Sequence, residues 1–222
     1  MKRMTKSTRE KIYEKVRDRI TYGYLNPGER LIEESLVKEF KVSRTPIRES
    51  LRQLENEGLI SFERNKGFTV SKLSPKQVDE IYKLRWLLEG YASRLTAEKA
   101  TERDLTRLGE LHEKLKEMVQ EKDLMGWLQF NALFHDYLCD HCGNGNLISI
   151  MKIIQRRIYR YKYITISIPG YMERYLQQHE GIIKGCEKND GEMAETCMRD
   201  HLETVRTVLL QHLNKYPLVT HQ

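Results

Sequence analysis

Residues 28–70 limit most strongly what this chain can fold into, because two short helical patterns, a turn and a hairpin pattern follow one another there. Ser43 or Thr45 can cap the second helix, and Pro46 suits its first turn, where no backbone N–H is needed. Gly58 lies just past its end, where a residue with positive φ is common. The apolar residues at helical spacing are Leu31, Leu36 and Phe40 in the first helix and Ile47, Leu51 and Leu54 in the second.

Three arginines form one basic stripe on the second of these helices. Arg44, Arg48 and Arg52 recur at every fourth residue, about 90° around the helix from its apolar face. The stripe can therefore face outward while the apolar residues face a core. Guanidinium groups match phosphates and the O6/N7 edge of guanine, so the pattern predicts a helix that enters the major groove of DNA. The alternative is an ordinary solvated charged face.

The predicted hairpin adds a second basic element. Leu59–Phe62 and Phe68–Val70 have the β-branched and aromatic composition of strands. The turn between them, residues 63–67, carries Arg64 and Lys66 at its tip. A basic hairpin beside a recognition helix can reach phosphates or the minor groove. Together these elements predict a winged helix-turn-helix.

The distribution of charge supports the same interpretation. Residues 1–75 contain 17 Lys and Arg and 11 Asp and Glu, a net charge of +6, whereas the remainder contains 21 of each kind. The whole positive charge of the chain therefore belongs to its first third. This asymmetry indicates a polyanionic partner for that part alone.

The composition of the 222 residues also excludes several classes of protein. No apolar run approaches the 18 residues needed to span a membrane, and the basic N-terminus lacks the apolar region of a signal peptide. We therefore expect a cytoplasmic protein with reduced thiols. Cys139 and Cys142 form a C-x-x-C, but no second close pair completes a zinc ribbon. They are interpreted as ordinary small residues near a helix end.

The pattern predicts two domains, residues 1–73 and 74–222, in a mainly α protein. Ser7 and Glu10 have capping-box spacing at the start of a helix over residues 7–23. Ser74 can cap the helix that Pro75 opens. No convincing strand follows, so the second domain is predicted to be an all-α antiparallel bundle. Its six expected helices cover residues 75–99, 102–121, 123–142, 146–167, 170–187 and 189–214.

The N-terminal third closely resembles the DNA-binding domain of the GntR family of bacterial transcriptional regulators. The matching segments are residues 26–31, 42–51, 54–59 and 66–70. The resemblance implies that Arg44 and Arg48 contact DNA, that Thr45 binds a phosphate, and that Lys66 and Gly67 bring the wing tip close to the duplex. Glu34 is a departure, because many relatives carry a basic residue there. This departure removes one phosphate contact or indicates a different base preference.

The remainder resembles the FadR-type C-terminal domain, known as FCD, of a large GntR subfamily. Matching residues are spread along it: Ile81, Arg85, Glu89, Phe134, His135, Leu138, Leu147, His179, Ile182, Asn189, Asp190, Ala194 and His201. Six helices, rather than seven, place the chain nearer the branch typified by VanR. The resemblance implies an effector-binding and dimerisation domain.

Three histidines of this domain, His135, His179 and His201, fall on three different predicted helices. In the resembling family, these histidines and a carboxylate at the position of Asn131 hold a divalent metal, and small organic acids often complete its coordination. Three imidazoles suit zinc or nickel. Asn131 departs from the family, since an amide oxygen is a weaker ligand than a carboxylate. A polar pocket without metal is the alternative.

Arg85 has two interpretations. In the family pattern it faces the same bundle core and can pair with an effector carboxylate. It can equally form a structural ion pair with Glu89, four residues later on the same helix.

The expected function is a homodimeric transcriptional regulator that binds a palindromic operator in double-stranded DNA and responds to an organic acid. One alternative is a metal-dependent enzyme that uses the three histidines. Glu180 is its only evident general base, but it points about 100° away from His179 on a helix, and no H-E-x-x-H motif is present. A second alternative is a metal-free sensor of acyl chains, against which a polar histidine trio argues. We therefore expect no enzymatic activity.

Overall fold

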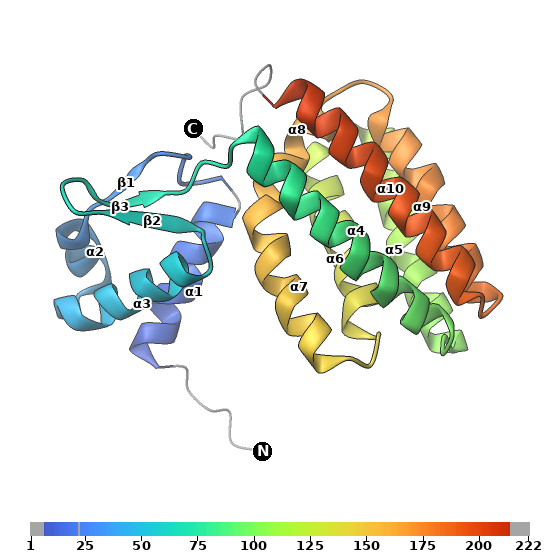
Figure 1. Ribbon diagram of the computed structural model, residues 1–222, viewed down its shortest axis with the longest axis horizontal. Coiled ribbons are helices and arrows are strands. Elements are labelled where there is room, and N and C mark those ends of the chain that lie inside the picture. Colours follow the sequence, from blue (N-terminus) through green and yellow to red (C-terminus); the bar gives the residue numbers. More distant parts are fainter. Residues whose placement is uncertain (1–6, 22, 214–222) are drawn as a thin grey trace. The chain divides into compact units, whose positions relative to one another are not determined.

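A computed structural model describes residues 7–21 and 23–213 of the chain (Figure 1). The chain divides between Leu73 and Ser74 into two compact units, here called unit 1 and unit 2. In the described residues, no helix is both long and apolar enough to cross a membrane.

Unit 1 is a helical domain with a small antiparallel sheet. Its elements are α1 (Thr8–Thr21), β1 (Arg30–Leu31), α2 (Glu33–Phe40), α3 (Arg44–Asn56), β2 (Ile60–Glu63) and β3 (Gly67–Val70). The predicted hairpin corresponds to β2 and β3. Strand β1 was not predicted, and Leu31, which was expected on the first of the two helices, lies in this strand instead. Strand β1 pairs Arg30 with Thr69 and Leu31 with Phe68, which gives the sheet order β1-β3-β2. A strand of two residues is too short to show a periodic pattern.

Local signals explain where the helices of unit 1 begin and end. Ser7 and Glu10 form both hydrogen bonds of the predicted capping box, although the helix ends at Thr21 rather than at residue 23. Lys41 turns the chain between α2 and α3 in the left-handed region, with φ 54°. Gly58 takes φ 72° after α3, as predicted. Ser43 is the N-cap of α3, but its side chain makes no capping hydrogen bond.

Unit 2 consists of helices. Its α-helices are α4 (Pro75–Ala97), α5 (Glu102–Glu121), α6 (Leu124–Asp140), α7 (Gly145–Ile158), α8 (Lys162–Ile166), α9 (Tyr171–Glu187) and α10 (Gly191–His212). Ser74 and Gln77 form a capping box before Pro75, so the predicted start of α4 is confirmed. Helices α4 and α10 pack side by side along much of their length (Figure 1).

The prediction of one helix over residues 146–167 was wrong. Helix α7 ends at Ile158, a 3₁₀ turn follows at Tyr159–Tyr161, and the short α8 then begins. Helix α7 packs against α4 and α6, whereas α8 packs against α6, α9 and α10. The tighter 3₁₀ turn lets the chain change neighbours. The described part of unit 2 therefore has seven α-helices rather than the six predicted.

Candidate nucleic-acid interface and metal centre

The outer face of α3 carries the arginine stripe. The side chains of Arg44, Arg48 and Arg52 are 69%, 66% and 57% exposed. On the opposite face, Ile47, Leu51 and Leu54 are fully buried in the core of unit 1. The helix therefore holds three guanidinium groups on a surface whose position is fixed by packing behind it. Thr45 is exposed beside them at the start of the helix.

Each of these arginines has a carboxylate partner. Arg44 donates to Glu34 at 3.1 Å, and Arg48 donates through Nε to Glu33 at 2.8 Å. Both glutamates lie at the start of α2. Exposed ion pairs of this kind contribute little to stability, so a phosphate or base edge can replace the carboxylates.

Arg52 connects α3 with the two strands of the wing. Its guanidinium lies over the rings of Phe62 and Phe68, at 4.8 and 5.5 Å from their centroids, and it donates to Glu55 at 2.7 Å. The two phenylalanine rings are themselves 4.9 Å apart. Arg52 thus holds α3 and the wing together, a role that its place in the stripe did not predict.

The wing tip is the turn between β2 and β3. Gly67 adopts φ 77°, a conformation that L-residues rarely take. Lys66 forms an exposed ion pair with Glu63 at 2.7 Å, and Arg64 is exposed at the tip. These residues present two cations next to the outer face of β2 and β3.

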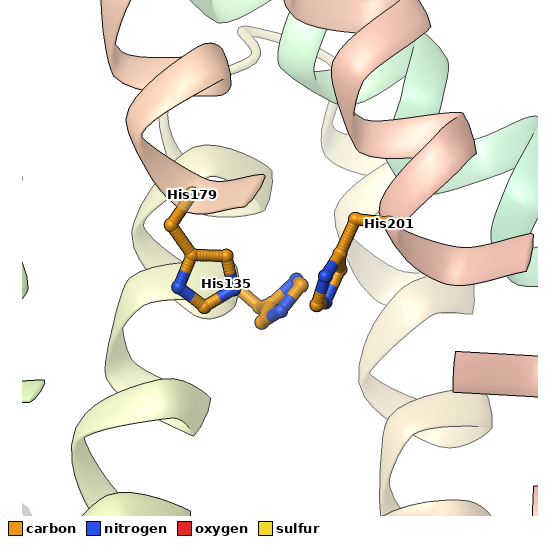
Figure 2. A group of neighbouring side chains, drawn as sticks. All are labelled: His135, His179 and His201. Atoms are coloured by element: carbon orange, nitrogen blue, oxygen red, sulfur yellow. The ribbon is translucent and has the colours of Figure 1, made fainter. Parts of the chain in front are cut away.

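The three histidines predicted to converge do so in unit 2. His135 on α6, His179 on α9 and His201 on α10 are each at most 3% exposed, and their rings face one another (Figure 2). One nitrogen from each ring lies within 4.8 Å of the others. Nitrogens bound tetrahedrally to one zinc ion are about 3.4 Å apart, given Zn–N bonds near 2.1 Å. The rings would therefore close by about 1 Å around an ion.

Two of the rings are oriented by hydrogen bonds from Nδ1. His135 Nδ1 lies 2.9 Å from Glu89 Oε2, and His201 Nδ1 lies 3.0 Å from Gln178 Oε1. Because both partners are oxygen acceptors, Nδ1 is the donor in each ring, and the lone pair is on Nε2. Metal-binding histidines in proteins are generally oriented in this way.

His179 supplies the third ring. It is fully buried, stacks on Phe134 at 4.5 Å, and neither of its nitrogens has a hydrogen-bond partner among the described residues. A buried imidazole without a partner is costly, and a metal ion would satisfy one of its two nitrogens. Burial lowers the pKa of His135, His179 and His201 below the ordinary histidine value. All three are therefore neutral at pH 7, as metal ligands must be.

A small cavity lies beside the histidines. Its volume of about 20 Å³ is enough for a water molecule or an ion. Asn131 lines it together with His135 and His201, and the Asn131 side chain makes no hydrogen bond to another described residue. Its amide oxygen is thus available to a ligand in the cavity. Glu180, the general base considered for an enzyme, is exposed on α9.

Arg85 is buried and forms the ion pair with Glu89, at 2.6 Å from Nε and 3.2 Å from Nη2. Burial alone would raise the pKa of Glu89, but Arg85 and His135 hold it well below its usual range. Glu89 thus links Arg85 to His135. Of the two interpretations of Arg85, the ion pair is present. The Arg85 side chain also lines the cavity.

Sequence reasoning missed one functional candidate, Lys162. It lines the same cavity and is 6% exposed at the start of α8. Its spacing of four residues from the buried Ile158 could have indicated that it faces the core. A lysine whose neighbours in the sequence are Tyr and Ile is more often a solvated residue.

The comparisons with known proteins agree with both halves of the structure. The family model "Bacterial regulatory proteins, gntR family" matches residues 8–70, and the "FCD domain" model matches residues 80–204. An uncharacterized HTH-type transcriptional regulator, YdhC of Bacillus subtilis, is 33% identical over 85% of each chain. The HTH-type transcriptional regulator McbR of Escherichia coli is 27% identical over 90% of this chain and 91% of its own.

Among solved structures, E. coli McbR/YncC has the same fold. The two superpose with a TM-score of 0.82 at 24% identity, covering 95% of this chain and all of the other.

Proposed function

Because this chain belongs to the GntR family of bacterial regulatory proteins and carries an FCD domain, we propose that it is a transcriptional regulator that binds a palindromic operator as a homodimer. Its α3 helix and wing would contact the duplex, and unit 2 would sense a small carboxylate-bearing metabolite beside a metal ion. The observation that carries the DNA-binding part is the exposed arginine stripe on a helix with a buried opposite face.

The DNA contact is tested with Arg48→Ala on the promoter region of the protein's own gene. Loss of a guanidinium that contacts a base edge costs about 1–3 kcal/mol. Arg107→Ala is the matched control, because Arg107 is an exposed, glutamate-paired arginine on α5. Binding should also weaken steeply with salt. Wild-type affinity of Arg48→Ala, or a flat salt response, would rule out α3 as the recognition helix.

We propose that His135, His179 and His201 bind one zinc or nickel ion, with Asn131 as a weak additional ligand. Support comes from the unpartnered nitrogens of His179 and from the two rings held by Glu89 and Gln178. A bound ion would supply a Lewis-acidic centre with positions open to a carboxylate oxygen.

Elemental analysis after exhaustive dialysis tests this site. One equivalent of metal is expected in the wild type and much less in His179→Ala, while His141→Ala, which alters an exposed histidine, should retain it. Asn131→Asp should bind the ion more tightly, because it adds a charged ligand. Equal metal content in wild type and His179→Ala would refute the assignment.

The homodimer is proposed to form through apolar side chains that α4 and α7 leave exposed. Leu84, Leu87 and Tyr91 on α4, and Ile150 and Ile153 on α7, are 42–50% exposed. The two helices pack against each other, and exposed apolar surface of this kind marks association sites. Light scattering should give twice the monomer mass of 26.4 kDa. Leu87→Glu should give monomers, whereas Leu133→Glu on α6 should not. A monomeric wild type would contradict the proposal.

Two alternative functions, a metal-dependent enzyme and a metal-free sensor of acyl chains, have less support. Members of the family are transcriptional regulators and not enzymes, which disfavours a catalytic metal site. A metal-free acyl sensor is disfavoured by the small volume of the cavity and by the two cations, Arg85 and Lys162, in its wall. The assignment to the VanR-like branch was based on six predicted helices, and the seven α-helices in the described part of unit 2 remove that support.

A further inference from the structure

The cavity beside the histidines contains a cation without a counterion. Lys162 is only 6% exposed and lines the cavity with Arg85 and His135. Among the described residues, its side chain makes no ion pair and no hydrogen bond. Its Nζ lies 5.9 Å from the centroid of the Tyr159 ring. A cation–π contact at that distance offsets only a small part of the cost of burying an ammonium group.

The neighbouring carboxylates offset the burial of Lys162 only in part, because burial lowers its pKa more than Glu89 and Asp136 raise it. Glu89 is engaged by Arg85 through both of its oxygens and also accepts from His135. Asp136 is close enough to interact electrostatically, but it forms no ion pair with Lys162, and burial raises the pKa of its carboxyl group. Of the residues that line the cavity, Arg85 and Lys162 carry positive charges, and none carries a carboxylate.

Arg85 and Lys162 therefore differ in what they can offer a ligand. The Nε and Nη2 groups of Arg85 are already used by Glu89. The ammonium of Lys162 has three donors and no acceptor in the described structure. The cavity of about 20 Å³ admits a water-sized group such as one oxygen of a carboxylate, and the remainder of an acid would require neighbouring side chains to move.

We propose that Lys162 is the anion-binding residue of the effector pocket and that it holds a carboxylate group independently of the metal ion. This inference rests on the proposed sensing role of unit 2. It assigns the effector's charge to α8, the short helix that the chain reaches only after its 3₁₀ turn. Helix α8 packs against α6, α9 and α10, the three helices that carry the histidines. A carboxylate bound to Lys162 would therefore lie beside all three of these helices.

The test uses the full-length protein and thermal melting followed by tryptophan fluorescence, since Trp86 and Trp127, the two tryptophans of the chain, both lie in unit 2. Sodium formate and sodium acetate are the probes, and sodium chloride at equal ionic strength is the reference. Metal-free protein, after dialysis against EDTA, is compared with zinc-loaded protein. We expect both carboxylates, but not chloride, to raise Tm in both preparations.

Lys162→Met removes the charge at nearly constant side-chain length, and Lys162→Arg retains it. The Met variant should lose the response to carboxylates while the Arg variant keeps at least part of it. Without added acid, Lys162→Met should melt about 2 °C or more above the wild type, because an unpaired buried charge has been removed. The control Lys152→Met, at a lysine paired with Asp140 and half exposed, should change neither property.

An equal carboxylate response in Lys162→Met would overturn the proposal. So would a response that requires zinc, or one that chloride reproduces. A lower Tm of Lys162→Met that is accompanied by a wild-type carboxylate response would show that Lys162 has a structural partner instead. Absence of bound metal in the elemental analysis, combined with a carboxylate response that depends on Lys162, would refute only the metal site.

Discussion

Glu34 places a carboxylate beside the arginine stripe of α3, on the surface proposed to contact DNA. Its pairing with Arg44 at 3.1 Å brings the two side chains to the same part of that surface. A carboxylate is repelled by phosphates, but it can accept a hydrogen bond from the N4 amino group of cytosine. Having Glu34 where many relatives carry a basic residue is therefore expected to change the base preference.

We predict that Glu34→Gln relaxes base selection. It should bind non-operator DNA more tightly, because the repulsion is gone, and discriminate less well at one base pair of each half-site, by about 1 kcal/mol. The matched control is Glu39→Gln, which removes the same charge from α2 at a glutamate that pairs with Lys15 and Arg19 on α1. Selection from a randomised operator library measures the effect. Identical base preferences in wild type and Glu34→Gln would contradict it.

Residue roles that depend on helical periodicity could be predicted from the sequence, whereas roles set by distant partners could not. The outward stripe of Arg44 and Arg48 follows from spacing alone. The hydrogen bonds from Arg85 to Glu89 and from His135 to Glu89 join α4 to α6. The sequence predicted only the contact between Arg85 and Glu89, because these two residues are four apart on one helix. Convergence of the histidines came from the family resemblance, because their positions span residues 135–201.

At the scale of elements, α3 and the wing are joined through one side chain. Arg52 lies over Phe62 on β2 and Phe68 on β3. Planar stacking of a guanidinium on aromatic rings is not reproduced by an ammonium. The contact between α3 and the wing therefore favours arginine over lysine at this position.

We predict that Arg52→Lys and Arg52→Met weaken DNA binding to a similar extent, and by less than Arg48→Ala. If Arg52 acted simply as a charge near a phosphate, Arg52→Lys would bind like the wild type. Loss of the stack should also destabilise unit 1 by about 0.5–1 kcal/mol. Fluorescence anisotropy over a range of salt concentrations gives the affinities. Arg64→Met, at the exposed wing tip, is the control that removes a charge without touching α3.

Element boundaries were predictable where a capping residue marks them and unpredictable where tertiary packing decides. Ser7 and Ser74 mark the starts of α1 and α4, because each forms a capping box with the residue three positions later. The break after Ile158 has no such signal, because tertiary packing decides it. Helix α7 packs against α4 and α6, whereas α8 packs against α6, α9 and α10. Strand β1 likewise forms only because β3 is available to pair with Arg30 and Leu31.

At the scale of the whole molecule, the buried histidines make the stability of the chain depend on pH. Burial lowers the pKa of His135, His179 and His201 in the folded state, whereas an unfolded histidine titrates near 6.5. Between these values the unfolded chain binds protons that the folded chain does not. Their contribution is therefore intact above about pH 6.5 and is lost as the pH falls below it.

We predict that unit 2 loses stability below pH 6.5, by up to about 1.4 kcal/mol per pH unit for each of the three histidines. Tryptophan fluorescence reports this unit selectively, because Trp86 and Trp127 both belong to it. His179→Gln should flatten the pH dependence by about one proton, and His141→Gln, at an exposed position, should not. Zinc should stabilise the wild type most at pH 7 and progressively less toward pH 5, since protons and metal compete for the same nitrogens. A Tm that is constant from pH 7 to 5 would show that the histidines ionise as freely in the folded chain as in the unfolded one.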